Sequence, residues 1–272
     1  FGSRHKHDCG TLMCCRCFLQ SSPSRDSQDP LIHNMTDGKK LCVVVGVGPG
    51  LGGFLAKKYA KEGYLVAVCA RTKEKVDAIA AQIGGRGYAY DCSDADATKA
   101  AFASMRADFG VPVHTLIYNA GAGAFKPLDQ TSVEDFDRCW SSNARGLFIH
   151  AKEVVEDMKA NGGYIAVSGA TASWRGAPPT SAFAPAKGAQ RLLCQSLAKE
   201  LGPKGVHVCL FVLDGMFGSN SSDFDAENCP KNRLNPAAMA DTYFDVGSQP
   251  PTCWSTELNI VPSEVMGSMC TI

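Results

Sequence analysis

The sequence predicts a single α/β domain in which helices cover both faces of a doubly wound parallel sheet. Three observations favour this fold class. Apolar runs of strand length alternate with helical segments from Leu41 onward, and such alternation is typical of a parallel sheet with crossover helices. A glycine-rich turn separates the first run from the first helical segment. The chain has 272 residues, of which 45% are apolar and 20% charged, and this is enough to build one sizeable core.

The strands and the first helix follow from local patterns. The first helix is expected directly after the glycine-rich turn, because Leu51, Phe54, Leu55 and Tyr59 recur at helical spacing and form one apolar stripe. Strands are expected at the apolar runs bounded by turn residues. These runs are residues 41–47, 64–70, 113–118, 164–168 and 206–213.

The second half of the chain adds two helices and a last strand. A long helix is expected over residues 183–201. Asn235 followed by Pro236 is typical of an N-cap and a first helical residue, so a short helix is expected to about Val246. A final strand near residues 254–260 completes the sheet.

Residues 1–38 lack hydrophobic periodicity and are predicted to form a flexible N-terminal extension to a domain of residues 39–272. A weak targeting segment, or upstream sequence ahead of Met35, are alternative interpretations of this stretch. Its histidines and cysteines could bind a metal, but their spacing matches no pair of zinc-ligand dyads, so no metal site is expected. These residues are His5, His7, Cys9, Cys14, Cys15 and Cys17.

Charge and hydropathy argue against several classes of partner. Lys plus Arg and Asp plus Glu number 27 each, so no net charge attracts nucleic acid or anionic lipid. No apolar run approaches the roughly 18 residues needed to span a bilayer. Single cysteines within apolar stretches, such as Cys69, Cys194 and Cys209, indicate a reducing compartment, and a cytoplasmic location is expected. Without a secretory leader, the sequons at Asn34 and Asn220 are expected to stay unmodified.

The first turn has the pattern G-x-x-x-G-x-G over residues 46–52, between an apolar strand and an amphipathic helix. Glycines permit a tight turn and a close approach of the backbone, so a pyrophosphate can lie against the amides of the helix N-terminus. The sequence therefore predicts a Rossmann-type dinucleotide site. Its residues are Gly46, Gly48, Gly50, Leu51 and Gly52.

The end of the second strand indicates which dinucleotide binds. A NAD site usually has an Asp or Glu there, which holds the adenosine ribose hydroxyls. Here Ala70 is followed by Arg71, whose guanidinium suits a 2′-phosphate. NADP(H) is therefore preferred over NAD(H). Alternatively, Arg71 and Lys73 are solvated charges at the start of a helix.

The apolar run over residues 113–118 leads into Tyr118-Asn119-Ala120-Gly121. With the glycine motif, this segment resembles the short-chain dehydrogenase/reductase family, and the resemblance covers roughly residues 41–262. Tyr118 stands where the family usually has the first Asn of N-N-A-G. The resemblance implies contact with adenine by Asp91 and closure of the cofactor site by the residues after Tyr118. The implied cofactor-binding residues are Asp91, Asn119, Ala120 and Gly121.

The resemblance implies an active site of Asn, Ser, Tyr and Lys, with the last two spaced Y-x-x-x-K. Asn143 and Lys187 match the first and last of these. Phe183 stands at the Tyr position and Ala170 at the Ser position. A positioned acid or base contributes typically about 10²- to 10⁴-fold to a rate. Because phenylalanine has no proton to give, ordinary catalysis is expected to be badly weakened.

Neighbouring groups could substitute. Ser168 lies two residues before Ala170, on the same face of the strand but one rung farther back. Lys187 keeps a role without the tyrosine, because its ammonium can hold the nicotinamide ribose. Other polar residues lie near the loop, although such hydroxyls more often bond to local backbone. They are Thr171, Ser173, Arg175 and Ser181.

After the run over residues 206–213, the resemblance assigns Gly215 and Ser219 to the nicotinamide end of the cofactor, and residues 216–235 to a substrate lid. In the family, the helix that corresponds to residues 183–201 packs against its symmetry mate. A homodimer or homotetramer is therefore expected; alternatively, the leucines of this helix pack only on their own sheet. These are Leu192, Leu193 and Leu197.

Two hypotheses of function follow. The first is an NADP(H)-dependent oxidoreductase that acts on an unknown carbonyl or alcohol. Its proton would come from Asn143, Lys187, a bound water or the substrate itself. The second is a non-catalytic nucleotide-binding protein with a regulatory or scaffold role. A tyrosine that reaches the nicotinamide from elsewhere favours the first hypothesis, and its absence favours the second.

Overall fold

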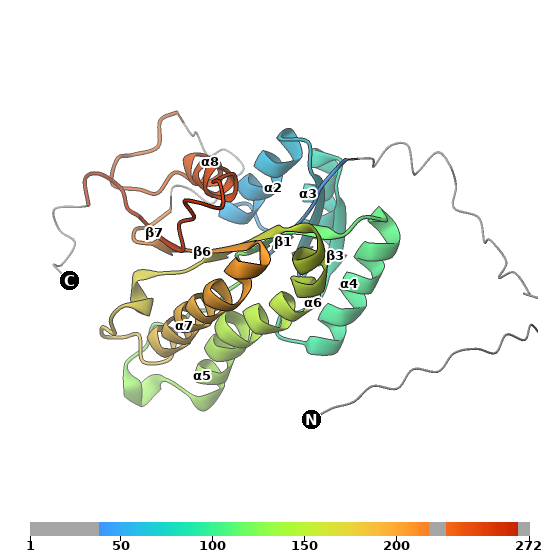
Figure 1. Cartoon of the computed structure of the whole chain (residues 1–272). Coiled ribbons are helices and arrows are strands. Elements are labelled where there is room, and N and C mark those ends of the chain that lie inside the picture. The colour runs from blue at the N-terminus through green and yellow to red at the C-terminus, as the bar shows by residue number, and fades with distance from the viewer. Residues whose placement is uncertain (1–37, 218–226, 266–272) are drawn as a thin grey trace, which may run out of the picture. The chain divides into compact units, whose positions relative to one another are not determined.

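A parallel sheet of seven strands forms the centre of the domain (Figure 1). The computed structural model describes residues 38–217 and 227–265. The strand order is β3-β2-β1-β4-β5-β6-β7. From β1 the chain builds the sheet outward to β3 on one side and then, from β4, outward to β7 on the other, so the predicted doubly wound sheet is confirmed. The strands are β1 Leu41–Val45, β2 Leu65–Ala70, β3 Arg86–Ala89, β4 Val113–Tyr118, β5 Gly163–Ser168, β6 Val206–Leu213 and β7 Glu257–Ile260.

The two edge strands carry the weakest sequence signals. β3 pairs with β2 from Arg86 onward, but it is only half-buried and contains no apolar run. β7 begins at Glu257, later than the predicted start near residue 254. Before it, the backbone N–H of Ser255 donates to Oε1 of the Gln249 side chain at 2.7 Å, and so it does not pair with the sheet. Edge strands are covered on fewer sides, so burial imposes less apolar alternation on them.

Helices cover both faces of the sheet, as Figure 1 shows. Side chains of α4, α6 and α7 belong to one buried apolar cluster, and those of α2, α3 and α8 belong to the other. The helix α5 precedes α6 and contacts α7. The helices are α2 Leu51–Lys61, α3 Lys73–Ile83, α4 Ala95–Phe109, α5 Val133–Trp140, α6 Gly146–Asn161, α7 Phe183–Leu201 and α8 Pro236–Gly247.

The predicted long helix and the predicted N-cap are confirmed. α7 spans Phe183–Leu201. At the start of α8, the side chain of Asn235 accepts hydrogen bonds from the N–H groups of Ala237 and Ala238, and Pro236 takes the first helical position. Since Pro lacks an N–H, it loses nothing at that position.

One short π-helical turn, η2 Ser141–Arg145, joins α5 to α6. The hydroxyl of Tyr118, at the end of β4, donates to the carbonyl of Ser142 at 2.6 Å. Gly146 is required beside it, because a Cβ there would lie 2.1 Å from the same hydroxyl. This turn carries Asn143, which is fully buried.

Residues 1–37 lie outside the part that the structure describes, so the N-terminal extension remains a prediction, as does the absence of metal binding there. Within the described ranges, no three His, Cys, Asp or Glu side chains gather as metal ligands could. None of the described helices combines the length and apolar character that crossing a membrane requires.

Candidate functional site

The carboxyl ends of three central strands meet at one edge of the sheet. Gly46 follows β1, Asn119 follows β4, and Ser168 ends β5. In open α/β sheets, ligands bind outside the carboxyl ends of the strands, where the strand order reverses. The reversal here lies between β1 and β4, and the predicted glycine turn is placed directly there.

The turn packs tightly against the segment after β4. Gly46 has a φ of +89°, and a Cβ there would lie 2.4 Å from the backbone nitrogen of Ala120. No side chain caps the N-terminus of α2 at Gly50, so the first amides of the helix remain available to an anion. Around Gly48, a Cβ would meet nothing within 4 Å, and Leu51 is buried as the first helical residue. The turn therefore has the open space and the amides that a pyrophosphate requires.

Asn119 ties this turn to the rest of the sheet edge. Its Nδ2 donates to the carbonyl of Gly46 at 2.9 Å, and its Oδ1 accepts from the hydroxyl of Ser168 at 2.8 Å. The Ser168 hydroxyl also lies 2.9 Å from the hydroxyl of Tyr243 in α8. Ser168 therefore directs its side chain into this buried chain of hydrogen bonds.

A cleft of about 600 Å³ extends from the glycine turn across the carboxyl end of β2. Arg71 and Asp91 both line it. Their assignment to the adenosine end of a dinucleotide stays a prediction. The N–H and hydroxyl of Ser93 donate to Oδ1 of Asp91 at 2.8 and 2.7 Å, and these bonds hold the pKa of that carboxyl below its usual range. Asp91 is therefore an ionised acceptor at neutral pH. Residues that the sequence did not single out also line the cleft, and they include Tyr90, Cys92, Arg138 and Ser142.

Asn143 and Lys187 come together beside Gly121. The Nδ2 of Asn143 donates to the carbonyls of Ala122 and Cys139, each at 2.8 Å. Its Oδ1 is buried and has no hydrogen-bond partner among the described residues. A Cβ on Gly121 would lie 2.8 Å from this Oδ1 and 3.6 Å from Nζ of Lys187. A donor and an acceptor thus converge on the space that the glycine leaves open.

Lys187 is a buried cation without a carboxylate partner in the described structure. Its Nζ donates to the carbonyl of Ser168 at 3.0 Å and to Oε1 of Gln190 at 2.9 Å. Burial lowers the pKa of Lys187 to about 8, and only the nearby Cys194 acts in the opposite direction. The sequence did not identify Gln190, although its spacing of three residues from Lys187 on a helix places both on one face.

The family model that matches this chain is that of short chain dehydrogenases, over residues 40–223. The chain belongs to the short-chain dehydrogenase family. Its similarity to curated relatives is moderate. It is 32% identical over 178 residues to a D-threitol dehydrogenase of Mycolicibacterium smegmatis, which covers 63% of this chain and 68% of that protein. It is 30% identical over 204 residues to a 3-oxoacyl-[acyl-carrier-protein] reductase of Rattus norvegicus, which covers 73% of this chain and 86% of that protein.

Solved structures of short-chain dehydrogenases are similar over most of the chain. One from Rhodopseudomonas palustris has a TM-score of 0.70 at 30% identity and covers 82% of this chain and 98% of its own. An alcohol dehydrogenase from the archaeon Thermococcus sibiricus, complexed with 5-hydroxy-NADP, has a TM-score of 0.73 at 25% identity. That match covers 83% of this chain and 97% of the archaeal one.

In this short-chain dehydrogenase, Phe183 places an aromatic ring beside the lysine. Its centroid lies 5.9 Å from Nζ of Lys187 and 5.1 Å from the ring of Phe125. Ala170 lies just before the short 3₁₀ helix η3 Thr171–Ser173, and its carbonyl accepts from the N–H of Ser173 at 2.9 Å. Neither Phe183 nor Ala170 offers a side-chain proton.

A tyrosine from elsewhere in the chain could replace that proton source, and all seven tyrosines lie in the described part of the chain. Four of the seven hydroxyls form hydrogen bonds away from Lys187 and Asn143. Their partners are the side chains of Asp108, His150 and Ser168 and the backbone carbonyl of Ser142. That of Tyr164 donates to the carbonyl of Tyr243, and that of Tyr59 is buried in the core without a partner among the described residues. Tyr64 lies beside Thr115, and burial raises its pKa. No phenol of the described chain therefore bonds to Lys187 or Asn143.

The other loop residues that the sequence considered are dispersed. Thr171 Oγ1 lies 3.4 Å from Oδ1 of Asp214, and Ser181 Oγ lies 3.5 Å from Oγ1 of Thr131, both long for hydrogen bonds. Ser173 has a buried hydroxyl without a partner in the described structure.

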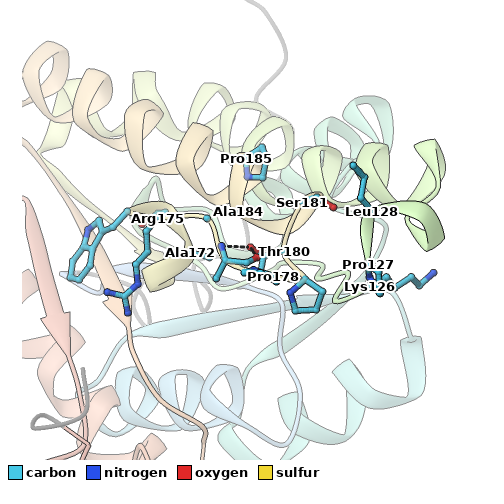
Figure 2. A pocket seen from close by; sticks show the side chains of 15 residues that line it. Lys126, Pro127, Leu128, Ala172, Arg175, Pro178, Thr180, Ser181, Ala184 and Pro185 are labelled. Atoms are coloured by element: carbon cyan, nitrogen blue, oxygen red, sulfur yellow. Dashed lines mark hydrogen bonds between the residues drawn. The ribbon is translucent and has the colours of Figure 1, made fainter. Parts of the chain in front are cut away.

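A mostly apolar cavity of about 610 Å³ lies beside the first turn of α7. The loop Ala172–Ser181 lines it together with Lys126, Pro127 and Leu128, and Figure 2 shows Arg175 at one end and Lys126 at the other. From α7, Ala184 and Pro185 face this cavity. Lys187 and Gln190 are not among its lining residues, so the cavity lies to one side of the Lys187 centre.

The far end of the site is described only in part. Gly215 packs closely, since a Cβ there would lie 2.9 Å from the ring of Pro262. Phe217 forms an isolated parallel bridge with Leu234. Ser219 and Asn220 lie outside the described residues, so the assignment of Ser219 to the nicotinamide remains a prediction.

Proposed function

We propose that this short-chain dehydrogenase is an NADP(H)-dependent oxidoreductase that interconverts a carbonyl and an alcohol, with Lys187 as the group that gives and takes the proton. The observation that carries the proposal is the convergence of Nζ of Lys187 and Oδ1 of Asn143 on the space at Gly121. Gly121 also lines the cleft at the glycine turn, whereas Asn143 and Lys187 are not among the residues that line it.

The residues present fit a nicotinamide dinucleotide. The open backbone at Gly48 and the uncapped amides after Gly50 suit the pyrophosphate. Arg71 at the cleft, with Ala70 in place of an acid, suits a 2′-phosphate and hence NADP(H). Lys187 would hold the nicotinamide ribose. When bound, the nicotinamide supplies or accepts the hydride at the substrate carbon.

The protein's own contribution is the proton at oxygen. Phe183 and Ala170 stand where the family pattern has Tyr and Ser, so neither position supplies it. In reduction, the ammonium of Lys187 gives a proton to the carbonyl oxygen and becomes a neutral amine, which regains a proton from solvent; in oxidation, the amine takes the proton of the alcohol. A pKa of about 8 suits both directions, because a general acid or base is most effective when its pKa lies near the working pH.

The test is direct. The purified protein is titrated with NADPH and NADH by fluorescence, and a panel of carbonyl substrates is assayed with the unmodified protein and with Lys187→Met and Phe183→Tyr. We expect tighter binding of NADPH and measurable turnover, which Lys187→Met abolishes. Turnover retained by Lys187→Met would exclude the lysine as proton donor. No binding of either nucleotide would overturn the cofactor assignment.

One observation favours a second candidate, a non-catalytic nucleotide-binding protein with a regulatory or scaffold role. No tyrosine of the described chain bonds to Lys187 or Asn143, so the site has no substitute phenol. In that case the dinucleotide stabilises the fold or reports redox state to a partner. Nucleotide binding without turnover over the whole panel would establish this alternative.

We also propose that two copies of the chain associate through helices α5, α6 and α7. Leu193 and Leu197 pack against the core of their own domain, so of the predicted leucines only Leu192 faces outward. Large exposed apolar side chains gathered on neighbouring helices are typical of an interface. On these helices they are Val133, Phe136, Trp140, Phe148 and Leu192.

Sedimentation velocity tests this association. We expect a dimer or tetramer, which Trp140→Lys combined with Leu192→Lys dissociates. Met216→Lys, at an equally exposed apolar residue outside these helices, is the control and should leave the assembly unchanged. A monomeric unmodified protein would refute the proposal.

We propose a reducing compartment, the cytoplasm, for this protein. Five cysteines of the described chain are buried thiols within or beside the core, and burial raises the pKa of each. Such thiols act as small apolar side chains rather than as disulfide partners. Fractionation of cells that express the tagged full-length protein tests the location.

A further inference from the structure

Gln190 bridges the two groups on which the proposed chemistry depends. It lies on α7 and is fully buried. Its Oε1 accepts from Nζ of Lys187 at 2.9 Å, and its Nε2 donates to the backbone carbonyl of Asn143 at 3.2 Å. One amide therefore joins the lysine on α7 to the π-helical turn η2 that carries Asn143.

This bridge fixes the direction of the ammonium. An ammonium has three N–H donors, and the bonds to Ser168 O and Gln190 Oε1 use two of them. One donor is left over, and the Gly121 space lies near it, since a Cβ on Gly121 would lie 3.6 Å from Nζ and 2.8 Å from Oδ1 of Asn143. Without the amide, a flexible lysine side chain would hold only one of these bonds.

The bridge also leaves the charge of Lys187 uncompensated. An amide is neutral, whereas a carboxylate at the same place would form an ion pair and stabilise the ammonium. In the described structure, the groups that face the ammonium are Ser168 from β5, Gln190 and Cys194 from α7, and Asn143 from η2. None of them is an acid, and burial raises the pKa of the Cys194 thiol, so it stays neutral.

We infer that Gln190 is a positioning residue, which holds the ammonium of Lys187 toward the Gly121 space and orients it without neutralising it. This inference rests on the proposed role of Lys187 in the cofactor and substrate site. It gives a specific reason for a glutamine here: leucine would remove both hydrogen bonds, and glutamate would keep the shape but add a charge.

Two measurements on Gln190→Leu and Gln190→Glu test it. The first follows the ¹³Cε resonance of Lys187 against pH in the protein without nucleotide, assigned by its loss in Lys187→Met. The second measures NADPH affinity by fluorescence between pH 6 and 10. Gln195→Leu and Gln195→Glu are matched controls, because Gln195 is an exposed glutamine on the same helix. Circular dichroism establishes that each variant is folded.

In the unmodified protein we expect Lys187 to titrate near pH 8, with NADPH affinity falling above that pH. Gln190→Glu should raise this midpoint by about one pH unit or more, since it adds an opposite charge within bonding distance. Gln190→Leu should weaken NADPH binding at pH 7 by about 10-fold, as expected for a lost charge-assisted hydrogen bond. Both Gln195 variants should match the unmodified protein.

An unchanged Lys187 titration in Gln190→Glu would overturn the inference, and so would full NADPH affinity in Gln190→Leu. These results would leave the proposed function intact, provided that the unmodified protein binds NADPH and turns over a carbonyl. Failure of the unmodified protein to bind either nucleotide would overturn the proposed function, and the positioning role with it, whatever the resonance shows. If Gln190→Leu does not fold, the Gln190→Glu titration alone decides between the outcomes.

Discussion

Replacing Gly46 with alanine should damage the fold far more than replacing Gly63, although both glycines have nearly the same backbone conformation. Their φ angles are +89° and +86°. A left-handed conformation costs an L-residue roughly 1–2 kcal/mol, and this cost applies to both variants. The surroundings differ, because a Cβ on Gly63 meets nothing within 4 Å, whereas one on Gly46 lies 2.4 Å from the nitrogen and 2.5 Å from the Cα of Ala120.

The atoms that a Cβ on Gly46 would meet belong to the backbone, so no side-chain rotation relieves the clash. Overpacking adds typically about 1–3 kcal/mol. We therefore expect Gly63→Ala to lose about 1–2 kcal/mol of unfolding free energy and Gly46→Ala to lose about 2–5 kcal/mol, measured by urea denaturation. Gly46→Ala should also lose NADPH binding, and Gly63→Ala should retain it. Equal losses of stability in the two variants would refute the close-packing argument.

Three further predictions concern the cofactor, the buried hydrogen bonds and pH. Arg71→Ala should weaken NADPH binding about 10-fold and leave NADH binding nearly unchanged, as expected when one charge-assisted phosphate contact is lost; equal effects on both nucleotides would contradict the 2′-phosphate role. Tyr243→Phe removes the hydroxyl beside Ser168 and should cost about 1 kcal/mol of stability in urea denaturation, while Lys187 should titrate as before. Burial lowers the pKa of His150 to about 4, so the folded state favours its neutral form. The pKa of histidine in the unfolded chain is about 6.5. The contribution of His150 to the free energy of unfolding is therefore complete above pH 6.5 and is lost progressively down to pH 4, by at most about 1.4 kcal/mol per pH unit. In His150→Phe, this part of the pH dependence of stability should disappear.

The sequence predicted the fold because the fold depends on local signals. Apolar runs of strand length, the glycine turn before Leu51 and the Asn235 cap each act over a few residues, and each was placed within a few positions of the observed element. β3 carries no such signal, because an edge strand needs no apolar run. Its position follows only from pairing with β2.

The site was predictable where a motif fixes the residue and unpredictable where folding brings distant residues together. Gly46, Asn119 and Lys187 belong to motifs, and they lie at one edge of the sheet as those motifs imply. Gln190 and Arg138 have no motif in the sequence. Folding alone brings them to the site: Gln190 bonds to a carbonyl 47 residues away in the chain, and Arg138 lines the cleft at the glycine turn.

Phe183 and Lys187 lie one helical turn apart on α7, and both bear on where the proton comes from. A phenylalanine at this position has no hydroxyl that could donate a proton, and its ring centroid lies 5.9 Å from Nζ of Lys187. Phe183 therefore supplies no acid, while burial lowers the pKa of Lys187 to about 8. Gln190 completes the arrangement, because it holds the ammonium in place without adding a charge that would raise the pKa again. It follows that Phe183→Tyr changes two quantities at once: it adds a phenol and gives Lys187 a polar neighbour. A gain in turnover in that variant is therefore informative only together with its pH profile. If the phenol donates the proton, turnover should fall at the pH where the phenol titrates; if Lys187 donates it, turnover should fall at the pH where Lys187 titrates.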